Sequence, residues 1–128
     1  MISNKTKYGL HALIHLGKKY QNESLVLIAN LAQEERIPKK FLELILLELK
    51  NHGILESKKG KGGGYKLAKH PRDIKLGTVI RILEGPLAPV SCVSQTAYKR
   101  CKECKDEDHC GIRLVMKDVR EAIANILD

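Results

Sequence analysis

Residues 38–67 have the sequence PKKFLELILLELKNHGILESKKGKGGGYKL, and this stretch decides the fold. Apolar side chains recur at helical spacing from Phe41 onward, so its first half predicts a helix. Pro38 suits the start of that helix, where a missing N–H costs little, and Gly53 is placed to end it. A shorter amphipathic helix is expected just before, over residues 27–34. Two helices joined by a brief turn indicate a helix-turn-helix.

A basic hairpin is expected directly after the second of these helices. Residues 54–59 and 65–68 favour strands, and the glycine-rich run 60–64 between them favours a flexible turn. A nucleotide-phosphate loop is excluded, because these glycines lead into a strand and the pattern G-x-x-x-x-G-K-[ST] is absent. The hairpin therefore predicts the wing of a winged helix, and a merely mobile hairpin stays as the alternative.

The excess of basic residues is confined to the first two-thirds of the chain. Residues 1–84 contain 16 Lys and Arg against 8 Asp and Glu, whereas residues 85–128 contain 7 against 7. A basic module joined to a neutral one suggests that the first contacts a polyanion. No apolar run is long enough to span a membrane and no signal-peptide pattern opens the sequence, so a cytoplasmic protein with no membrane partner is expected.

All four cysteines, Cys92, Cys101, Cys104 and Cys110, fall in one polar stretch that predicts a loop. Thiolates are the soft ligands that select zinc or iron–sulfur clusters, and four of them complete such a site. The cytoplasm keeps thiols reduced, which favours a metal over disulfides. Cys101-x-x-Cys104 would also suit a thiol redox enzyme, but no βαβ unit is visible, so no enzyme is expected. The sequence leaves a 2Fe–2S cluster, a 4Fe–4S cluster and zinc open.

The last helix is expected over residues 111–127 and has an apolar seam. Its apolar side chains are spaced 4, 3, 4 and 3 residues apart, as in an a/d stripe, at Ile112, Met116, Val119, Ile123 and Ile126. Pairing with a second subunit is expected, and packing on its own domain is the alternative. Further helices over residues 5–20 and 74–84 complete three predicted regions: a basic DNA-binding domain at 1–84, a cysteine-rich loop at 85–110 and a dimerisation helix at 111–128.

Together these features resemble the IscR/NsrR-type winged-helix regulators of bacteria. The likeness covers nearly the whole chain and includes the cysteine loop and three stretches: Ile37-Pro38-x-x-Phe41-Leu42 to Gly53-Ile54-Leu55, Gly60-Lys61-Gly62-Gly63-Gly64-Tyr65-x-Leu67, and Val79-Ile80-x-x-Leu83-Glu84-Gly85. The resemblance implies a mostly α fold with a small β wing and a long C-terminal dimerisation helix. It also implies a homodimeric transcription factor that binds double-stranded DNA at a palindromic operator and holds an iron–sulfur cluster in its cysteine loop.

Candidate DNA contacts lie at the start of the first helix, at the start of the recognition helix and in the wing. Lysines bind phosphates, and glycines let the backbone approach a groove closely. The set comprises Lys5, Lys7, Tyr8, Lys39, Lys40, Glu43, Lys58, Lys59, Lys61, Gly62, Gly63 and Tyr65. The resemblance places Glu43 in the recognition helix, where a carboxylate near DNA gains by accepting from a cytosine amino group. Cluster-bearing members generally have three cysteines and a different fourth ligand, so that ligand stays open here, and His109 is an alternative to a thiolate.

Overall fold

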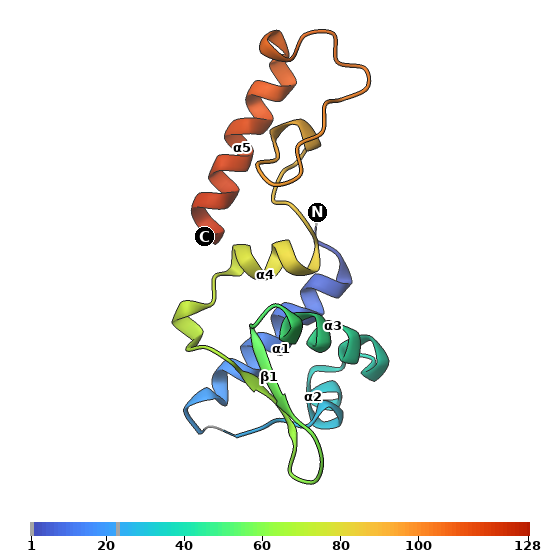
Figure 1. The fold of residues 1–128 in the computed structure, drawn as a ribbon, viewed down its shortest axis with the longest axis vertical. Helices are drawn as coiled ribbons and strands as arrows, with labels where there is room; N and C mark the ends of the chain where they lie inside the picture. Colours follow the sequence, from blue (N-terminus) through green and yellow to red (C-terminus); the bar gives the residue numbers. More distant parts are fainter. Residues whose placement is uncertain (1, 23) are drawn as a thin grey trace.

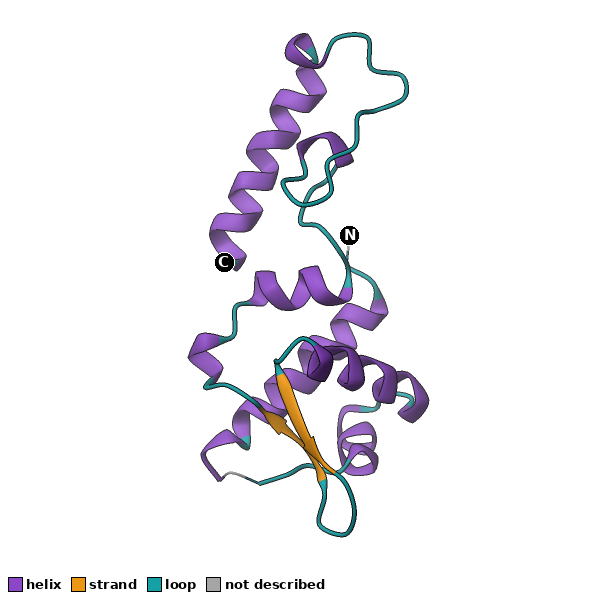
Figure 2. Ribbon diagram, in the orientation of Figure 1, coloured by secondary structure: helices purple, strands orange, loops and turns teal. Residues whose placement is uncertain are grey.

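The computed structural model describes residues 2–22 and 24–128. This part of the chain is mostly helical, with one antiparallel two-stranded sheet (Figures 1 and 2). The elements in order are α1 (Asn4–Lys18), α2 (Ile28–Glu35), α3 (Lys39–Asn51), β1 (Leu55–Lys58), β2 (Gly64–Leu67), α4 (Leu76–Leu83) and α5 (Gly111–Leu127). Figure 1 shows α1–α4 and the hairpin gathered at one end, with α5 and the loop before it extending away. No helix of the described residues is long and apolar enough to cross a membrane.

The helix ends follow local sequence chemistry. Ser3 caps α1 by accepting a hydrogen bond from the backbone N–H of Thr6 at 3.4 Å. Pro38 is the residue before α3, and Gly53, with φ +77°, follows its end as predicted. The helix expected over residues 74–84 is shorter, because Pro71–Asp73 forms a separate 3₁₀ turn before α4 begins at Leu76.

The core is built around α3. Its side chains Leu42, Ile45, Leu46 and Leu49 are completely buried against α1, α2, α4 and the hairpin. Gly9 of α1 allows the close approach of α4, because a Cβ there would lie 2.3 Å from Cδ1 of Leu83. Full burial of one Leu or Ile side chain contributes about 1.5–3 kcal/mol. The burial of these side chains therefore fixes which face of α3 is exposed to solvent.

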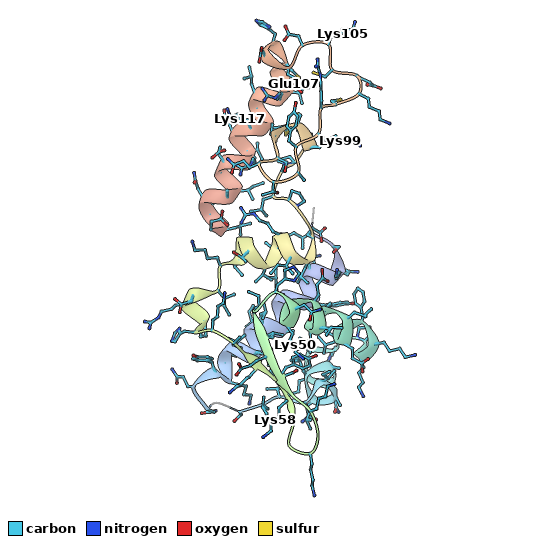
Figure 3. The ribbon with its side chains drawn as sticks, in the orientation of Figure 1. Lys50, Lys58, Lys99, Lys105, Glu107 and Lys117 are labelled. Carbon is cyan, nitrogen blue, oxygen red and sulfur yellow. The ribbon has the colours of Figure 1, made fainter. Side chains whose placement is uncertain are left out.

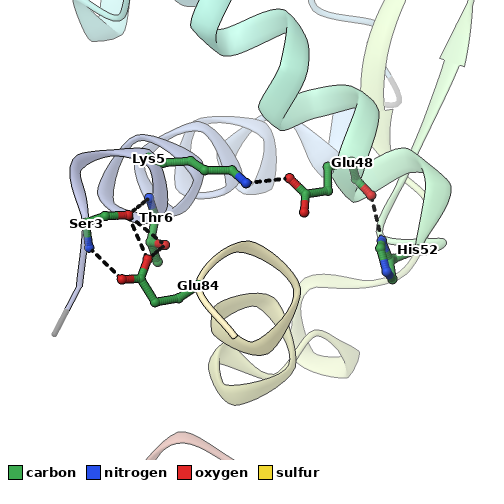
Figure 4. Close-up of polar contacts among 6 residues, drawn as sticks. All are labelled: Ser3, Lys5, Thr6, Glu48, His52 and Glu84. Carbon is green, nitrogen blue, oxygen red and sulfur yellow. Dashed lines mark hydrogen bonds and ion pairs between the residues drawn. The ribbon is translucent and has the colours of Figure 1, made fainter. Parts of the chain in front are cut away.

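A polar network fastens the start of α1 to the end of α4 (Figure 4). Glu84 follows α4, and its carboxylate accepts hydrogen bonds from the hydroxyls of Thr6 at 2.6 Å and Ser3 at 2.7 Å. The Thr6 side chain is fully buried, so its hydroxyl needs this partner. These donors hold the pKa of Glu84 below its ordinary value of 4.5, the Thr6 bond having the larger effect.

The turn end of the hairpin is tied to the segment before α2. Strands β1 and β2 pair from Leu55↔Leu67 to Lys58↔Gly64. Val26 adds an isolated bridge, since its N–H donates to the Tyr65 carbonyl at 2.8 Å and its own carbonyl accepts from the Tyr65 N–H at 2.8 Å. The hairpin was expected from the sequence, but this bridge was not.

Helix α5 keeps most of its apolar stripe in solvent. Ile112 is 68% exposed and Ile126 is 82% exposed, and Arg120 is the buried side chain among the described residues of the helix. Its end is held to α4 by Asp128, whose carboxylate accepts from both terminal nitrogens of Arg81 at 2.8 and 2.9 Å. Packing on its own chain therefore leaves the predicted a/d seam largely uncovered.

Two glycines of α1 provide a matched test of the packing around Gly9. Gly9→Ala is expected to be less stable than Gly17→Ala by about 1–3 kcal/mol, because only the first crowds Leu83 and Ile45. Nothing lies within 4 Å of a Cβ built on Gly17, and both changes gain helix propensity. Urea unfolding followed by circular dichroism measures the difference. Equal stability of the two variants would show that the helices do not meet as closely as described.

The network at Glu84 predicts a pH dependence of stability. Because its pKa is lowered in the folded chain, its contribution is present above the unfolded pKa and is lost as the pH falls through the folded value. The urea midpoints of wild type and Glu84→Gln should therefore converge as the pH falls below the ordinary value of 4.5. Asp118→Asn, on the exposed surface of α5, is the control and should show no such convergence. A wild-type advantage that persists at low pH would contradict this account.

Candidate nucleic-acid interface and cysteine cavity

A groove of about 540 Å³ lies between α3 and the wing. Its lining includes the side chains of Lys39 and Lys50 from α3 and of Lys58 and Lys59 from the wing, with Glu43 as its one carboxylate among the described residues. Figure 3 shows Lys50 and Lys58 in this part of the molecule, far from Lys105 and Glu107 at the other end. A concave surface with four lysines suits a polyanion.

The structure gathers half of the predicted DNA contacts in this groove and places the others around it. Lining residues from the predicted set are Lys39, Glu43, Lys58, Lys59, Gly63 and Tyr65. Lys40 is exposed on α3, and Lys61 and Gly62 are exposed at the tip of the wing. Burial, and then the negative charge of Glu43, raises the pKa of Tyr65, so its hydroxyl stays protonated as a donor. Their contact with DNA stays a prediction.

The glycines of the wing are required by the turn itself. Gly60 and Gly62 have φ of +93° and +77°, where L side chains are strained. A Cβ on Gly63 would lie 2.1 Å from the carbonyl oxygen of Lys58, so no side chain fits. The glycines thus shape a tip that holds Lys61 outward, and the same bare backbone leaves room for close approach to a ligand.

The three candidates on α1 lie in different surroundings. Lys5 forms an ion pair with Glu48 of α3 at 2.8 Å (Figure 4), so a phosphate would have to compete with that carboxylate. Tyr8 packs edge-to-face on Phe41 with ring centroids 5.7 Å apart and supports the core. Lys7 is exposed. None of the three lines the groove, and DNA contact by them stays a prediction.

Sequence reasoning missed Lys50 and Leu47 as groove residues. Both follow Lys39 and Glu43 at helical spacing along one side of α3, so the periodicity of the helix could have found them.

The four cysteines line one cavity of about 650 Å³ in front of α5. Cys92 belongs to the 3₁₀ turn Ser91–Val93, Cys101 and Cys104 share a turn in which the Cys104 N–H donates to the Cys101 carbonyl at 3.1 Å, and Cys110 precedes α5. That they form one metal site stays a prediction. No three His, Cys, Asp or Glu side chains of the described residues converge closely enough to hold a metal ion.

Two hydrogen-bond donors of the cavity wall are suited to sulfur ligands. The Sγ of Cys110 accepts from the backbone N–H of Arg113 at 3.4 Å, at the N-terminus of α5, where negative charge is favoured. The Nε of Arg113 is buried, and it is the buried side-chain nitrogen or oxygen that lacks a partner among the described residues. Such a donor calls for an acceptor. In its donor chemistry the cavity therefore suits an anionic ligand, although the cysteines do not converge as a ligand set among the described residues.

Polar contacts join the two ends of the segment 98–107, which contains Cys101 and Cys104. The Tyr98 hydroxyl donates to the carboxylate of Glu107, and Arg100 approaches the same carboxylate at 3.8 Å. The bond to Glu107 is the main reason that the pKa of Tyr98 is raised. His109, the alternative ligand, also lines the cavity, but its ring is 2.5 Å from Asp106 and its side chain is 82% exposed.

A helix-turn-helix followed by a paired β hairpin, with a lysine-lined groove between them, defines a winged-helix DNA-binding protein. The model of the Rrf2 family, described as iron-dependent transcriptional regulators, matches residues 2–128. The chain belongs to the Rrf2 family. Its members are transcriptional regulators and not enzymes, as the sequence predicted.

Individual relatives agree with this assignment. An rrf2-like HTH-type transcriptional regulator of Rhodobacter capsulatus is 41% identical over 121 residues, which is 93% of this chain and 81% of the relative. The structure of CymR, titled the global cysteine regulator of B. subtilis, has a TM-score of 0.79 and 31% identity over 100% of this chain and 89% of its own. T. potens IscR has a TM-score of 0.76 and 29% identity over 100% and 80%. The predicted fold class and family resemblance are confirmed.

Two lysines of the wing test its role in DNA binding. Lys61→Ala is expected to weaken binding to every duplex alike and to reduce the salt slope of log K by about 1 for each half-site, because one phosphate contact is lost. Lys66→Ala is the matched control and should have less effect, since Lys66 is paired with Glu56 at 3.2 Å. Fluorescence anisotropy at several salt concentrations measures both. A larger loss from Lys66→Ala would show that the tip of the wing is not the contact.

Proposed function

We propose that this chain is a homodimeric transcriptional regulator of the cytoplasm whose operator affinity is set by an iron–sulfur cluster in its cysteine cavity. The proposal assigns DNA binding to residues 1–84, the cluster to residues 85–110 and dimerisation to residues 111–128. The observation that carries it is the meeting of all four cysteines in one cavity beside the start of α5, at the end of the molecule away from the basic body. The family description as iron-dependent regulators supports the same reading.

DNA binding would use α3 in the major groove and the wing beside it. The groove between them places Lys39, Lys58 and Lys59 toward the sugar–phosphate backbone, and Glu43 is exposed for contact with a base. In a two-fold dimer, two such helices would enter grooves about one helical turn apart. The operator is therefore expected to be palindromic.

Dimerisation would cover the apolar stripe of α5. Ile112, Val115 and Val119 are 68%, 58% and 38% exposed, which is unusual for side chains at helical spacing on one element. A second copy of the same helix would bury them in an isologous contact. The partner is then a second copy of the same chain. The distance between the two DNA-binding domains depends on how α5 is fixed to each of them.

The cysteines Cys92, Cys101, Cys104 and Cys110 would hold the cluster, and the Nε–H of Arg113 would donate to one of its sulfurs. When bound, such a centre supplies a redox-active and oxidant-sensitive group. The chain's own residues would orient it: Tyr98 and Glu107 close the loop, and the start of α5 offers its backbone N–H groups. A fourth ligand from His109 is a variant of the same proposal.

Coupling between the two sites would pass through α5. This helix packs on the turn that contains Cys92, and Asp128, directly after its end, is bonded to Arg81 of α4. Ordering of residues 92–110 would therefore fix α5 relative to α4, and α4 lies directly on α1 and α3. Coupling free energies of this kind are typically about 1–3 kcal/mol.

A second candidate is a DNA-binding regulator without a sensing cluster, either free of cofactor or stabilised by zinc. The separation of the cysteines favours the cofactor-free form, because no three potential ligands of the described residues converge. The similarity to CymR, titled a global cysteine regulator, is also compatible with it. Metal analysis separates the two candidates.

Purification without oxygen tests the cluster. The wild-type protein is expected to be coloured and to contain iron and sulfide, and Cys104→Ala should lose both because one ligand is removed. The same variant should change the Kd for a selected duplex about 5- to 150-fold.

Lys102→Ala, between two of the cysteines, is the control and should keep iron and affinity. A colourless protein with one zinc per chain would establish a structural zinc site, and a protein without metal would establish the cofactor-free regulator. Either result would overturn the cluster and leave DNA binding standing.

A further inference from the structure

Two large apolar side chains of α3 face solvent on the surface that would meet DNA. Leu44 is 64% exposed and Leu47 is 47% exposed. The buried face of the same helix is already complete without them, since its four aliphatic side chains are 0% exposed. The core therefore does not explain why leucine occupies these two positions.

Leu47 lies near the centre of the outward face of α3. At about 100° per residue, the exposed arc of the helix extends from Lys39 to Glu48. Leu47 falls close to the middle of this arc, between Glu43 and Lys40. If α3 enters a groove of DNA with this face, Leu47 points toward the base edges. Leu44 lies nearer the edge of the exposed arc.

The surroundings of Leu47 identify duplex DNA as its partner. It lines the groove between α3 and the wing, together with Lys39, Lys50 and Lys58, and Leu44 is outside that lining. The same lining also contains Leu27 and Ile28, but its four lysines against one carboxylate among the described residues favour a polyanion over a purely apolar protein surface. A duplex matches this surface, because its phosphates pair with the lysines while its base edges face the centre.

Leucine has no hydrogen-bond donor or acceptor, so it gains only from an apolar group. Along the major groove the bases present donors and acceptors, and thymine adds a C5 methyl group. We propose that Leu47 contacts the thymine C5 methyl and makes the chain select thymine at one position of each half-site. This inference rests on the proposed function, in which α3 enters the major groove.

Replacement of thymine by deoxyuridine tests this contact, because it removes the methyl group alone. The full-length protein first selects a duplex from a random-sequence pool, and each thymine of that duplex is then replaced singly. One replacement per half-site is expected to raise the Kd of the wild type about fourfold, the effect of losing one buried methyl. Leu47→Ala should bind the thymine and deoxyuridine duplexes equally at that position, and Leu47→Met should restore part of the difference.

Leu44→Ala is the matched control and should keep the full difference between thymine and deoxyuridine. The assignment would be overturned if the wild type bound every deoxyuridine duplex as tightly as the thymine duplex. It would also be overturned if Leu47→Ala still preferred thymine. In both cases the selection of a duplex would still uphold DNA binding by this chain. Loss of the thymine preference in Leu44→Ala but not in Leu47→Ala would assign the methyl contact to Leu44 and overturn the proposal for Leu47. Failure to select any duplex would overturn the proposed function and this inference together.

Discussion

The one-sided burial of α3 is the constraint on which the rest of the structure depends. Four aliphatic side chains of this helix are buried against α1, α2 and α4. The helix therefore cannot rotate about its axis, and its exposed face is fixed. The cost of turning the helix would be the exposure of several side chains, each worth about 1.5–3 kcal/mol. The lysines, Glu43 and Leu47 are consequently presented as a fixed set beside the wing.

Much of this architecture could be predicted from the sequence, because local chemistry determines it. The glycine after α3 and the glycine-rich hairpin lie where residue type alone placed them. What failed depends on tertiary contacts. The pairing of Lys5 with Glu48 and the bridge from Val26 join segments distant in sequence, and no periodicity records them. The cysteines were expected together, and they share a cavity, but no three potential ligands of the described residues converge within it.

The two ends of the molecule differ in how they are held. The winged-helix body has a continuous apolar core, whereas α5 is joined to it mainly by the Arg81–Asp128 pair and by partly buried contacts near Ile80 and Leu127. Exposed ion pairs contribute little, about 0–1 kcal/mol. A weak junction of this kind responds to small changes on either side. It is therefore a suitable place for a ligand in the cysteine cavity to influence the basic body.

The bridge between Val26 and Tyr65 has a consequence for how the protein adapts to DNA. Two backbone hydrogen bonds join Tyr65, next to the turn of the hairpin, to Val26. The two strands are therefore held against the body and cannot move as a separate unit. Adjustment to minor grooves of different width is left to the few residues 59–63, whose glycines flex without side chains to rearrange. Tolerance of unlike operators would then be a property of the loop tip alone, and stiffening that tip would narrow the range of sites the regulator accepts.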